Sequence, residues 1–248
     1  MSDSEPTTIH DLADLLVASN SVLSSFEHQP WWRGQGVETW RLVPRVFRKD
    51  LGLYYEGGIA NKFVARAATR YDKCPPRGEL APWLFLMQHY GLPTRLLDWT
   101  ESPLLAAYFA VSQDEYADEA GALWAIDPFA LNGITTGHTG LHQPGTHGVW
   151  ELFEAAFKHV AADDGKVVAL ITEEVDVRMM VQMSGVTIHG SREPVEETTE
   201  LGHILHKFVV GAAAKKKIRD DLASFGIRER AVFPDLEHLA SDLTRDRY

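Results

Sequence analysis

Two short stretches of this chain gather side chains that could bind or transform an anionic ligand. The first is Trp31-Trp32-Arg33-Gly34-Gln35-Gly36. A guanidinium binds phosphate oxygens through paired hydrogen bonds, and glycine lets other groups approach the backbone closely. The adjacent tryptophans could stack on a ring of the ligand. The alternative is an arginine in a structural ion pair, beside tryptophans that belong to the core.

The second stretch, residues 88–100, concentrates polar and titratable groups in a segment otherwise suited to burial. Such groups are costly to bury unless they are paired, so they either form a network or line a pocket. Arg95 and Asp98 fit a buried ion pair as well as a binding role. His89 is the general acid or base candidate, and a structural histidine is its alternative. The stretch also holds Gln88, Thr94 and Thr100.

The other candidates are weaker. Arg178 and Gln182 lie four residues apart and would share one helical face, as functional residues or as an ordinary exposed pair. His138, His142 and His147 fall in a Gly-rich loop. Without cysteine pairs or an H-E-x-x-H pattern they do not predict a metal site. The P-loop and G-x-S-x-G motifs are also missing from the sequence.

The elements that must position these residues mix helices and strands without a regular β-α-β rhythm. We expect strands over residues 31–36, 93–100, 121–126, 167–171 and 186–189, with another within residues 201–210. We expect helices over residues 9–19, 80–90, 103–112 and 211–225, the first capped by Thr8 and the third by Ser102. A basic segment, residues 40–47, is expected as strand and turn, and residues 131–149 as a long loop. The pattern predicts an α+β fold, with a mixed or antiparallel sheet flanked by helices.

Domain organisation and cellular setting follow from length, charge and composition. We expect a disordered tail over residues 1–8 and a single domain over residues 9–248. With 35 acidic and 24 basic residues, the net charge of −11 gives no reason to expect nucleic acid as a partner, although a local basic cleft is compatible with it. A lone cysteine, a polar N-terminus and no long apolar run predict a cytoplasmic protein that does not associate with membranes.

Several of these motifs together resemble the FRG family, named for an aromatic-Arg-Gly signature. Trp32-Arg33-Gly34-Gln35 carries the signature, and Leu42-Val43-Pro44-Arg45 follows it. The resemblance is strongest from Gln88 to Val111, which includes His89-Tyr90-Gly91-Leu92-Pro93-Thr94-Arg95-Leu96-Leu97-Asp98-Trp99-Thr100. Residues 121–124, the Arg178 and Gln182 pair and residues 233–236 also fit. This resemblance implies one domain that covers most of the chain.

The layout of the motifs also resembles, more distantly, that of ADP-ribosyltransferases with an Arg-Gly pair on the first strand. This resemblance implies that NAD is the cofactor. Arg33, Gly34 and Gln35 would then bind its phosphates or ribose, together with Thr94, Arg95 and Thr100. His89, Asp98 and Gln182 would serve the chemistry. A third strand in those enzymes usually carries a glutamate that orients the ribose, and here the matching place holds Gln182.

Three functions therefore remain open from the sequence. The first is an NAD-dependent ADP-ribosyltransferase or NAD glycohydrolase, whose macromolecular acceptor the sequence does not name. The second is a non-catalytic module that binds a nucleotide or a partner protein, a possibility favoured by the missing glutamate. The third is a structural protein-protein domain, which would leave Arg33, His89 and Asp98 scattered in space.

Overall fold

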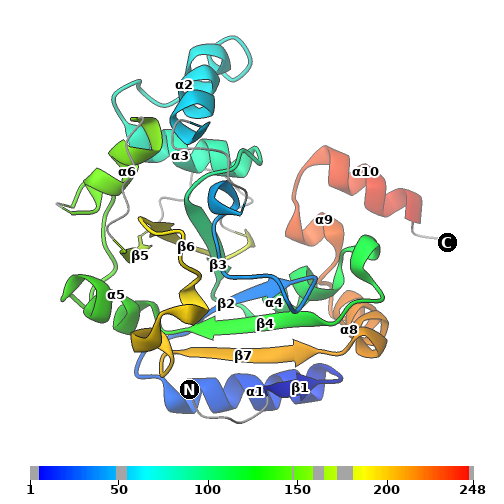
Figure 1. The fold of residues 1–248 in the computed structure, drawn as a ribbon. Coiled ribbons are helices and arrows are strands. Elements are labelled where there is room, and N and C mark those ends of the chain that lie inside the picture. The colour runs from blue at the N-terminus through cyan, green and yellow to red at the C-terminus, as the bar shows by residue number, and fades with distance from the viewer. Residues whose placement is uncertain (1–5, 49–54, 147, 159–164, 172–180, 246–248) are drawn as a thin grey trace.

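The chain folds around one seven-stranded mixed sheet. The computed structural model describes residues 6–48, 55–146, 148–158, 165–171 and 181–245. The strand order is β1-β7-β4-β2-β3-β6-β5, in which β1 pairs parallel with β7 and every other neighbour is antiparallel (Figure 1). The strands are β1 (Thr7–Ile9), β2 (Trp31–Gln35), β3 (Leu96–Thr100), β4 (Gly121–Ile126), β5 (Val167–Leu170), β6 (Ser184–His189) and β7 (Leu205–Val210).

Nine α-helices accompany the sheet in the described ranges, so the expected mixed sheet flanked by helices is confirmed. None of them combines the length and hydrophobicity that a bilayer crossing requires. They are α1 (Leu12–Ser25), α2 (Tyr55–Ala67), α3 (Leu80–His89), α4 (Pro103–Val111), α5 (Pro128–Thr136), α6 (Trp150–Phe157), α8 (Ala212–Ser224), α9 (Glu229–Val232) and α10 (Leu236–Arg245).

The sheet consists of two halves joined at one point. Strands β1, β7, β4 and β2 form one half, and β3, β6 and β5 form the other. Between β2 and β3 the only paired residues are Trp32 and Thr100, whereas β2 pairs with β4 over all five of its residues. If the β2–β3 pairing continued, Gly34 would lie opposite Asp98. The two strands instead part there, and Figure 1 shows β3 and β6 running across the direction of β2 and β4.

Three apolar cores hold these halves in place. On the first half, Trp32, Leu123 and Phe208 pack against α1, α4 and α8. On the second half, β3, β5 and β6 pack against α3 and α6. A third core lies between the halves and combines Trp31 and Trp124 from β2 and β4 with residues of β3 and β5. Strand alternation explains this arrangement, because Trp31 and Trp32 point to opposite faces of β2.

Helix α4 fixes the position of β2. Ser102 caps the helix by accepting a hydrogen bond from the Leu105 amide, and Pro103 occupies its first turn, as the sequence predicts. The helix crosses β2 at Gly34, where an added Cβ atom would lie 1.8 Å from the Ala106 carbonyl oxygen and 2.8 Å from the Ala110 nitrogen. Glycine is therefore needed at this position for the backbones to approach.

Four local predictions are wrong. Thr7 and Thr8, expected in a disordered tail, belong to β1, which exists only because β7 lies beside it. The first helix accordingly begins at Leu12 and is capped by Asp11, which accepts from the Ala13 and Asp14 amides.

The other two corrections concern the segments expected as a strand and as a loop. Residues 40–47 form no strand and end in a short 3-10 helix, Arg45–Phe47. The expected loop at residues 131–149 begins inside α5, because Asp127 caps that helix and Pro128 opens it. Arg178 and His147 lie outside the described residues.

Candidate functional site

A cleft opens where β2 and β3 part. It has a volume of about 260 Å³ and is called the central cleft below. The parting leaves part of the β3 edge without a strand partner, so backbone and side-chain polar groups face the opening. The central cleft is lined by Trp32, Arg33, Gly34, Gln35, Gly36, Trp40, Arg48, Asp98, Trp99, Thr100, Phe109, Gln113 and Gln182.

Arg33 bridges the two halves of the sheet at the cleft. Its side chain leaves β2, and Nη1 donates a 2.5 Å hydrogen bond to the Asp98 carbonyl oxygen on β3. Its Nε atom is buried and has no hydrogen-bond partner among the described residues. Burial lowers the pKa of Arg33 to about 10, with an opposing contribution from Asp98 and a smaller lowering contribution from Arg48. Arg33 is still a cation at neutral pH, with unused hydrogen-bonding capacity.

Arg48 stands near this cation, and Arg45 stands near Arg48. Burial lowers the pKa of Arg48, and the positive charge of Arg45 lowers it further, while Asp98 opposes both. Arg48 is held by a 2.9 Å hydrogen bond from its Nε to the Val43 carbonyl oxygen, and Arg45 Nη1 donates to the Gly91 carbonyl oxygen at 2.9 Å. Asp98 is the one carboxylate among the described residues that line the cleft. Arg33 and Arg48 thus share one anion, and Arg45 adds positive charge beside Arg48, which makes the cleft electropositive in an acidic protein.

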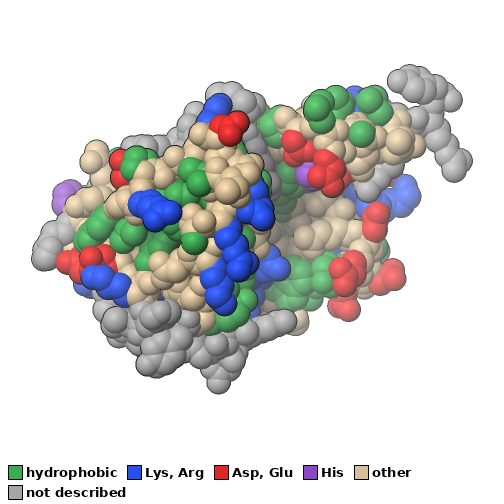
Figure 2. All heavy atoms as spheres, turned by 90° about the horizontal axis from the view of Figure 1, so that it is seen from above, with side chains coloured by type: hydrophobic (Ala, Val, Ile, Leu, Met, Phe, Trp, Pro, Cys, Tyr) green, Lys and Arg blue, Asp and Glu red, His purple; other side chains and the backbone are tan. Residues whose placement is uncertain are grey.

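The surface view is consistent with this charge distribution. Figure 2 shows Lys and Arg side chains gathered along the border of a hollow, while acidic side chains cluster on the opposite side of it. The hollow is therefore basic on one side and acidic on the other, and an anion is attracted to its basic side.

A relay of hydrogen bonds orients the Asp98 carboxylate. Gln88 on α3 donates from Nε2 to Asp98 Oδ2 at 2.7 Å. The Thr94 hydroxyl donates to Gln88 Oε1 at 2.5 Å and accepts from the Leu96 amide at 3.2 Å. Thr94 is buried and does not line the cleft. The structure thus places Thr94 behind the carboxylate, where it fixes Gln88.

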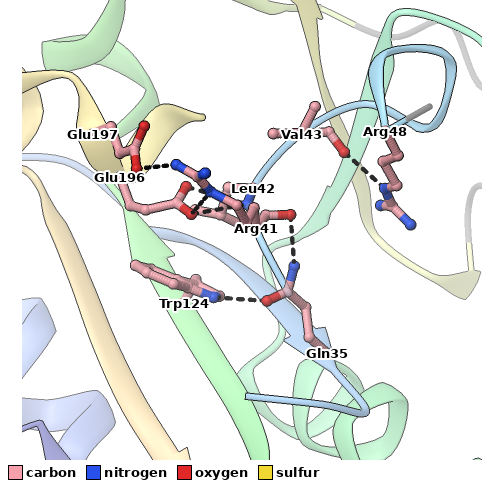
Figure 3. A network of polar contacts seen from close by, with 8 residues as sticks. All are labelled: Gln35, Arg41, Leu42, Val43, Arg48, Trp124, Glu196 and Glu197. Atoms are coloured by element: carbon pink, nitrogen blue, oxygen red, sulfur yellow. Dashed lines mark hydrogen bonds and ion pairs between the residues drawn. The ribbon is translucent and has the colours of Figure 1, made fainter. Parts of the chain in front are cut away.

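The residues beside Arg33 serve packing. The Cβ direction of Gly34 faces the backbone of α4 and not the open cleft. Gln35 is buried, accepts from Trp124 Nε1 at 2.9 Å and donates to the Arg41 carbonyl oxygen at 3.4 Å. Figure 3 shows Gln35 between Trp124 and the segment that carries Arg41. Gly34 and Gln35 both line the central cleft, but the packing of Gly34 and the hydrogen bonds of Gln35 tie β2 to its neighbours.

Thr100 and Gln182 close the end of the cleft where β2 and β3 still pair. The Thr100 hydroxyl donates to the Gln182 carbonyl oxygen at 2.7 Å and accepts from the Ser102 amide at 3.1 Å. The Gln182 side chain donates to the Val232 carbonyl oxygen at 3.1 Å, which ties α9 to the cleft. The next residue, Met183, has a left-handed backbone with φ of 47°.

Arg95 and His89 lie away from the cleft. Arg95 is buried and forms an ion pair with buried Glu56, with Nη2 at 2.6 Å and Nε at 3.0 Å from Glu56 Oε2. Arg95 thus takes the structural role that the sequence left open, with Glu56 and not Asp98 as its partner. His89 ends α3, packs edge-on against Tyr90 and is not part of the cleft wall.

The resemblance to ADP-ribosyltransferases gave nine residues a role in the site, and six of these nine line one cleft. They are Arg33, Gly34, Gln35, Asp98, Thr100 and Gln182. The sequence did not single out Arg48 or Trp40, which complete the wall. The sequence did contain a signal for this part of the wall, because Arg41, Arg45 and Arg48 follow Trp40 at short intervals.

Buried His189 behind the cleft was also missed. Burial, together with the positive charges of Arg33 and Arg95, lowers its pKa to about 3. Its Nε2 lies 2.8 Å from the Thr187 hydroxyl, which also accepts from Trp99 Nε1 at 3.0 Å. In the part of the chain that the structure describes, no group of three potential metal ligands is found.

The fold and the cleft define a mixed α/β protein with an arginine-lined site at the junction of two half-sheets. Residues 28–119 match the family model of the FRG domain, which confirms the recognition of that family over this stretch. All lining residues of the central cleft except Gln182 fall within the matched residues. No curated protein and no solved structure gives a match to the chain.

Proposed function

We propose that the central cleft binds the phosphate groups of a nucleotide, with NAD as the candidate, in a domain similar to ADP-ribosyltransferases. The observation that carries the proposal is that Arg33 and Arg48 line the cleft beside the single carboxylate of Asp98, with Arg45 next to Arg48. Like charges in a partly desolvated site repel each other, so an added anion lowers the electrostatic free energy of the cleft.

Arg33 and Arg48 are the residues that contact phosphate in this proposal. Arg33 lines the cleft with its Nη1 already held by the Asp98 carbonyl oxygen, and Arg48 lines the same cleft with its Nε held by the Val43 carbonyl oxygen. Anchored guanidinium groups lose little side-chain entropy when a ligand binds. A charge-assisted hydrogen bond contributes about 1.5–3 kcal/mol, which corresponds to roughly 10- to 150-fold in affinity.

Asp98 is the group proposed for the chemistry. Cleavage of NAD breaks the bond between nicotinamide and C1′ of the ribose, and the bonding pair leaves with nicotinamide. The positive charge that develops on the sugar is stabilised by a nearby carboxylate. Water or an acceptor then bonds to C1′ and loses a proton. Asp98 Oδ2 is held by Gln88, and Oδ1 has no hydrogen-bond partner among the described residues, so it can accept that proton.

A second candidate function is nucleotide binding without cleavage. Gln182 stands where the distant resemblance calls for a glutamate, and an amide cannot offset a full positive charge on the sugar. Asp98 also has Arg33 and Arg48 near it, which reduces its ability to stabilise another cation. Turnover and binding must therefore be measured separately.

Calorimetric titration of the purified protein tests the binding step. We expect NAD and ADP-ribose to bind and nicotinamide riboside, which has no phosphate, to bind at least tenfold more weakly. Arg33→Gln and Arg48→Gln each weaken NAD binding by roughly 10- to 150-fold. Arg66→Gln, an exposed arginine on α2, is the matched control and leaves binding unchanged. Equal affinities in all four proteins would refute phosphate binding in the cleft.

Nicotinamide release distinguishes the two candidate functions. The protein is incubated with NAD labelled in the nicotinamide ring, with and without cell extract as a source of acceptor. An enzyme releases label, and Asp98→Asn lowers the rate at least 100-fold while retaining NAD affinity within about threefold. Binding without release from the wild-type protein favours the non-catalytic module.

A further inference from the structure

A second cavity adjoins the central cleft and shares part of its wall. Its volume is about 410 Å³, and Trp40 and Arg48 belong to the lining of both cavities. The central cleft, at about 260 Å³, lies below the roughly 300–1,000 Å³ of typical ligand pockets. A nucleotide that binds in the central cleft therefore has room to extend only across the shared wall or into solvent.

The chemistry of the second cavity differs from that of the first. Val43, Phe47 and Pro194 give it an apolar floor beside Trp40, and its charged rim is formed by arginines. Arg41 on this rim is neutralised, because its guanidinium forms ion pairs with Glu196 and Glu197 (Figure 3). A cavity with apolar and aromatic walls and a few donors at its edge suits a planar heteroaromatic ring better than a phosphate.

The shared residues set the order of groups along such a ligand. Figure 3 shows Arg48 extending from its own backbone to the Val43 carbonyl oxygen, which keeps its guanidinium at the boundary of the two cavities. Phosphate at Arg33 and Arg48 places the group attached to that phosphate next to Trp40. The Trp40 indole is itself held edge-on by Tyr116, with ring centroids 4.9 Å apart.

We propose that the second cavity is the base-binding subsite of this protein, in which the base of the nucleotide stacks on Trp40 while its phosphates remain at Arg33 and Arg48. This inference rests on the proposed function, because it takes phosphate binding in the central cleft as given. It adds the class of ligand: a nucleotide recognised through its base, as opposed to a sugar phosphate or a free polyphosphate.

Calorimetry with two phosphate ligands tests the subsite. ADP and methyl diphosphate carry the same diphosphate ester, and ADP adds a ribose and a base. The Trp40 variants then measure how much of the difference comes from stacking of the base. We expect the wild-type protein to bind ADP at least tenfold more tightly, since base stacking on an aromatic side chain commonly gives that much or more. Trp40→Leu reduces this ratio to about twofold, and Trp40→Phe restores most of it.

Two further variants complete the design. Arg192→Gln, on the rim of the second cavity, lowers the ratio without touching the central cleft. Trp150→Leu, a half-buried tryptophan that lines a different cavity, keeps the wild-type ratio. Thermal unfolding of each variant shows whether it is folded, and Arg192→Gln keeps the test valid if Trp40→Leu is not.

The outcomes separate the two proposals. If the wild-type protein binds ADP and methyl diphosphate equally well, the base-binding subsite is refuted while phosphate binding stands. The same conclusion follows if the ratio survives both Trp40→Leu and Arg192→Gln. If neither ligand binds, phosphate binding in the central cleft is refuted, and the subsite falls with it.

Discussion

Replacing Gly34 by alanine tests whether the glycine of the Arg-Gly signature is needed for packing. A Cβ atom at this position would lie 1.8 Å from the Ala106 carbonyl oxygen, 2.9 Å from the Ala106 carbonyl carbon and 2.8 Å from the Ala110 nitrogen. All three are backbone atoms of α4, so no rotamer change can relieve the contact. The helix must move away from β2 by more than 1 Å to reach ordinary van der Waals separation, given that real Cβ contacts are essentially never under 3.0 Å.

The cost of this movement follows from what α4 holds. Its residues Leu105, Ala106 and Ala110 are buried in the core that also contains Trp32. Overpacking a core commonly costs about 1–3 kcal/mol, and a rigid obstacle belongs at the upper end. For a chain of this size, about 3 kcal/mol lowers the melting temperature by roughly 6–12 °C.

Urea and thermal unfolding of purified Gly34→Ala measure the effect. Gly58→Ala is the matched control, because an added Cβ there meets no atom within 4 Å and the residue lies inside α2. Alanine is the better helix former, so the control gains about 0.5–1 kcal/mol. If Gly34→Ala melts within about 2 °C of the wild-type protein, the close approach of α4 to β2 is not the reason for glycine at this position.

Two other predictions concern residues behind the cleft. The unfolded chain protonates His189 near pH 6.5, whereas the folded chain resists protonation down to about pH 3, so His189 contributes stability above pH 6.5 that is lost as the pH falls. In urea unfolding at pH 7.5, 6.0 and 5.0, the wild-type free energy of unfolding should fall by about 1.4 kcal/mol per pH unit below pH 6.5 because of His189, and His189→Gln should lack this loss. If the free energies of the two proteins fall in parallel with pH, the prediction is wrong. Gln88→Leu and Thr94→Val should each lower the free energy of unfolding by about 1 kcal/mol or more. Because the two side chains share one hydrogen bond, the double variant should lose about 1 kcal/mol less than the sum of the single losses. Strict additivity would show that the relay is not formed.

Local signals in the sequence predicted the elements that depend on neighbouring residues alone. Ser102 and Pro103 correctly mark the start of α4, because capping acts within one helical turn. Strand β1 was missed, since three residues make a strand here only with β7, which follows about two hundred residues later. Asp127 and Pro128 cap and open α5, a helix that overlaps the loop expected over residues 131–149.

The candidate site was predictable as a set of residue types but not as an arrangement. Arg33 and Asp98 meet because β2 and β3 pair at one residue and then part, which is a tertiary event with no local signature. The partner of Arg95 is Glu56, a residue 39 positions away on a helix whose sequence pattern gave no sign of a buried charge. Arg48 lines the cleft and lies just beyond residues 40–47, the segment that was expected to be a strand and turn.

The aromatic-Arg-Gly signature combines three separate requirements in adjacent positions. Successive side chains of a strand point to opposite faces, so Trp32 and Gly34 face α4 while Arg33 faces the second half of the sheet. Glycine allows α4 to lie close to β2, and this close packing fixes the strand from which Arg33 reaches the Asp98 backbone. The rigidity of the guanidinium therefore depends on the glycine beside it. If the cleft binds a nucleotide as proposed, a substitution at Gly34 should disturb that binding only through the position of Arg33, whereas a substitution at Arg33 should remove it and leave α4 in place.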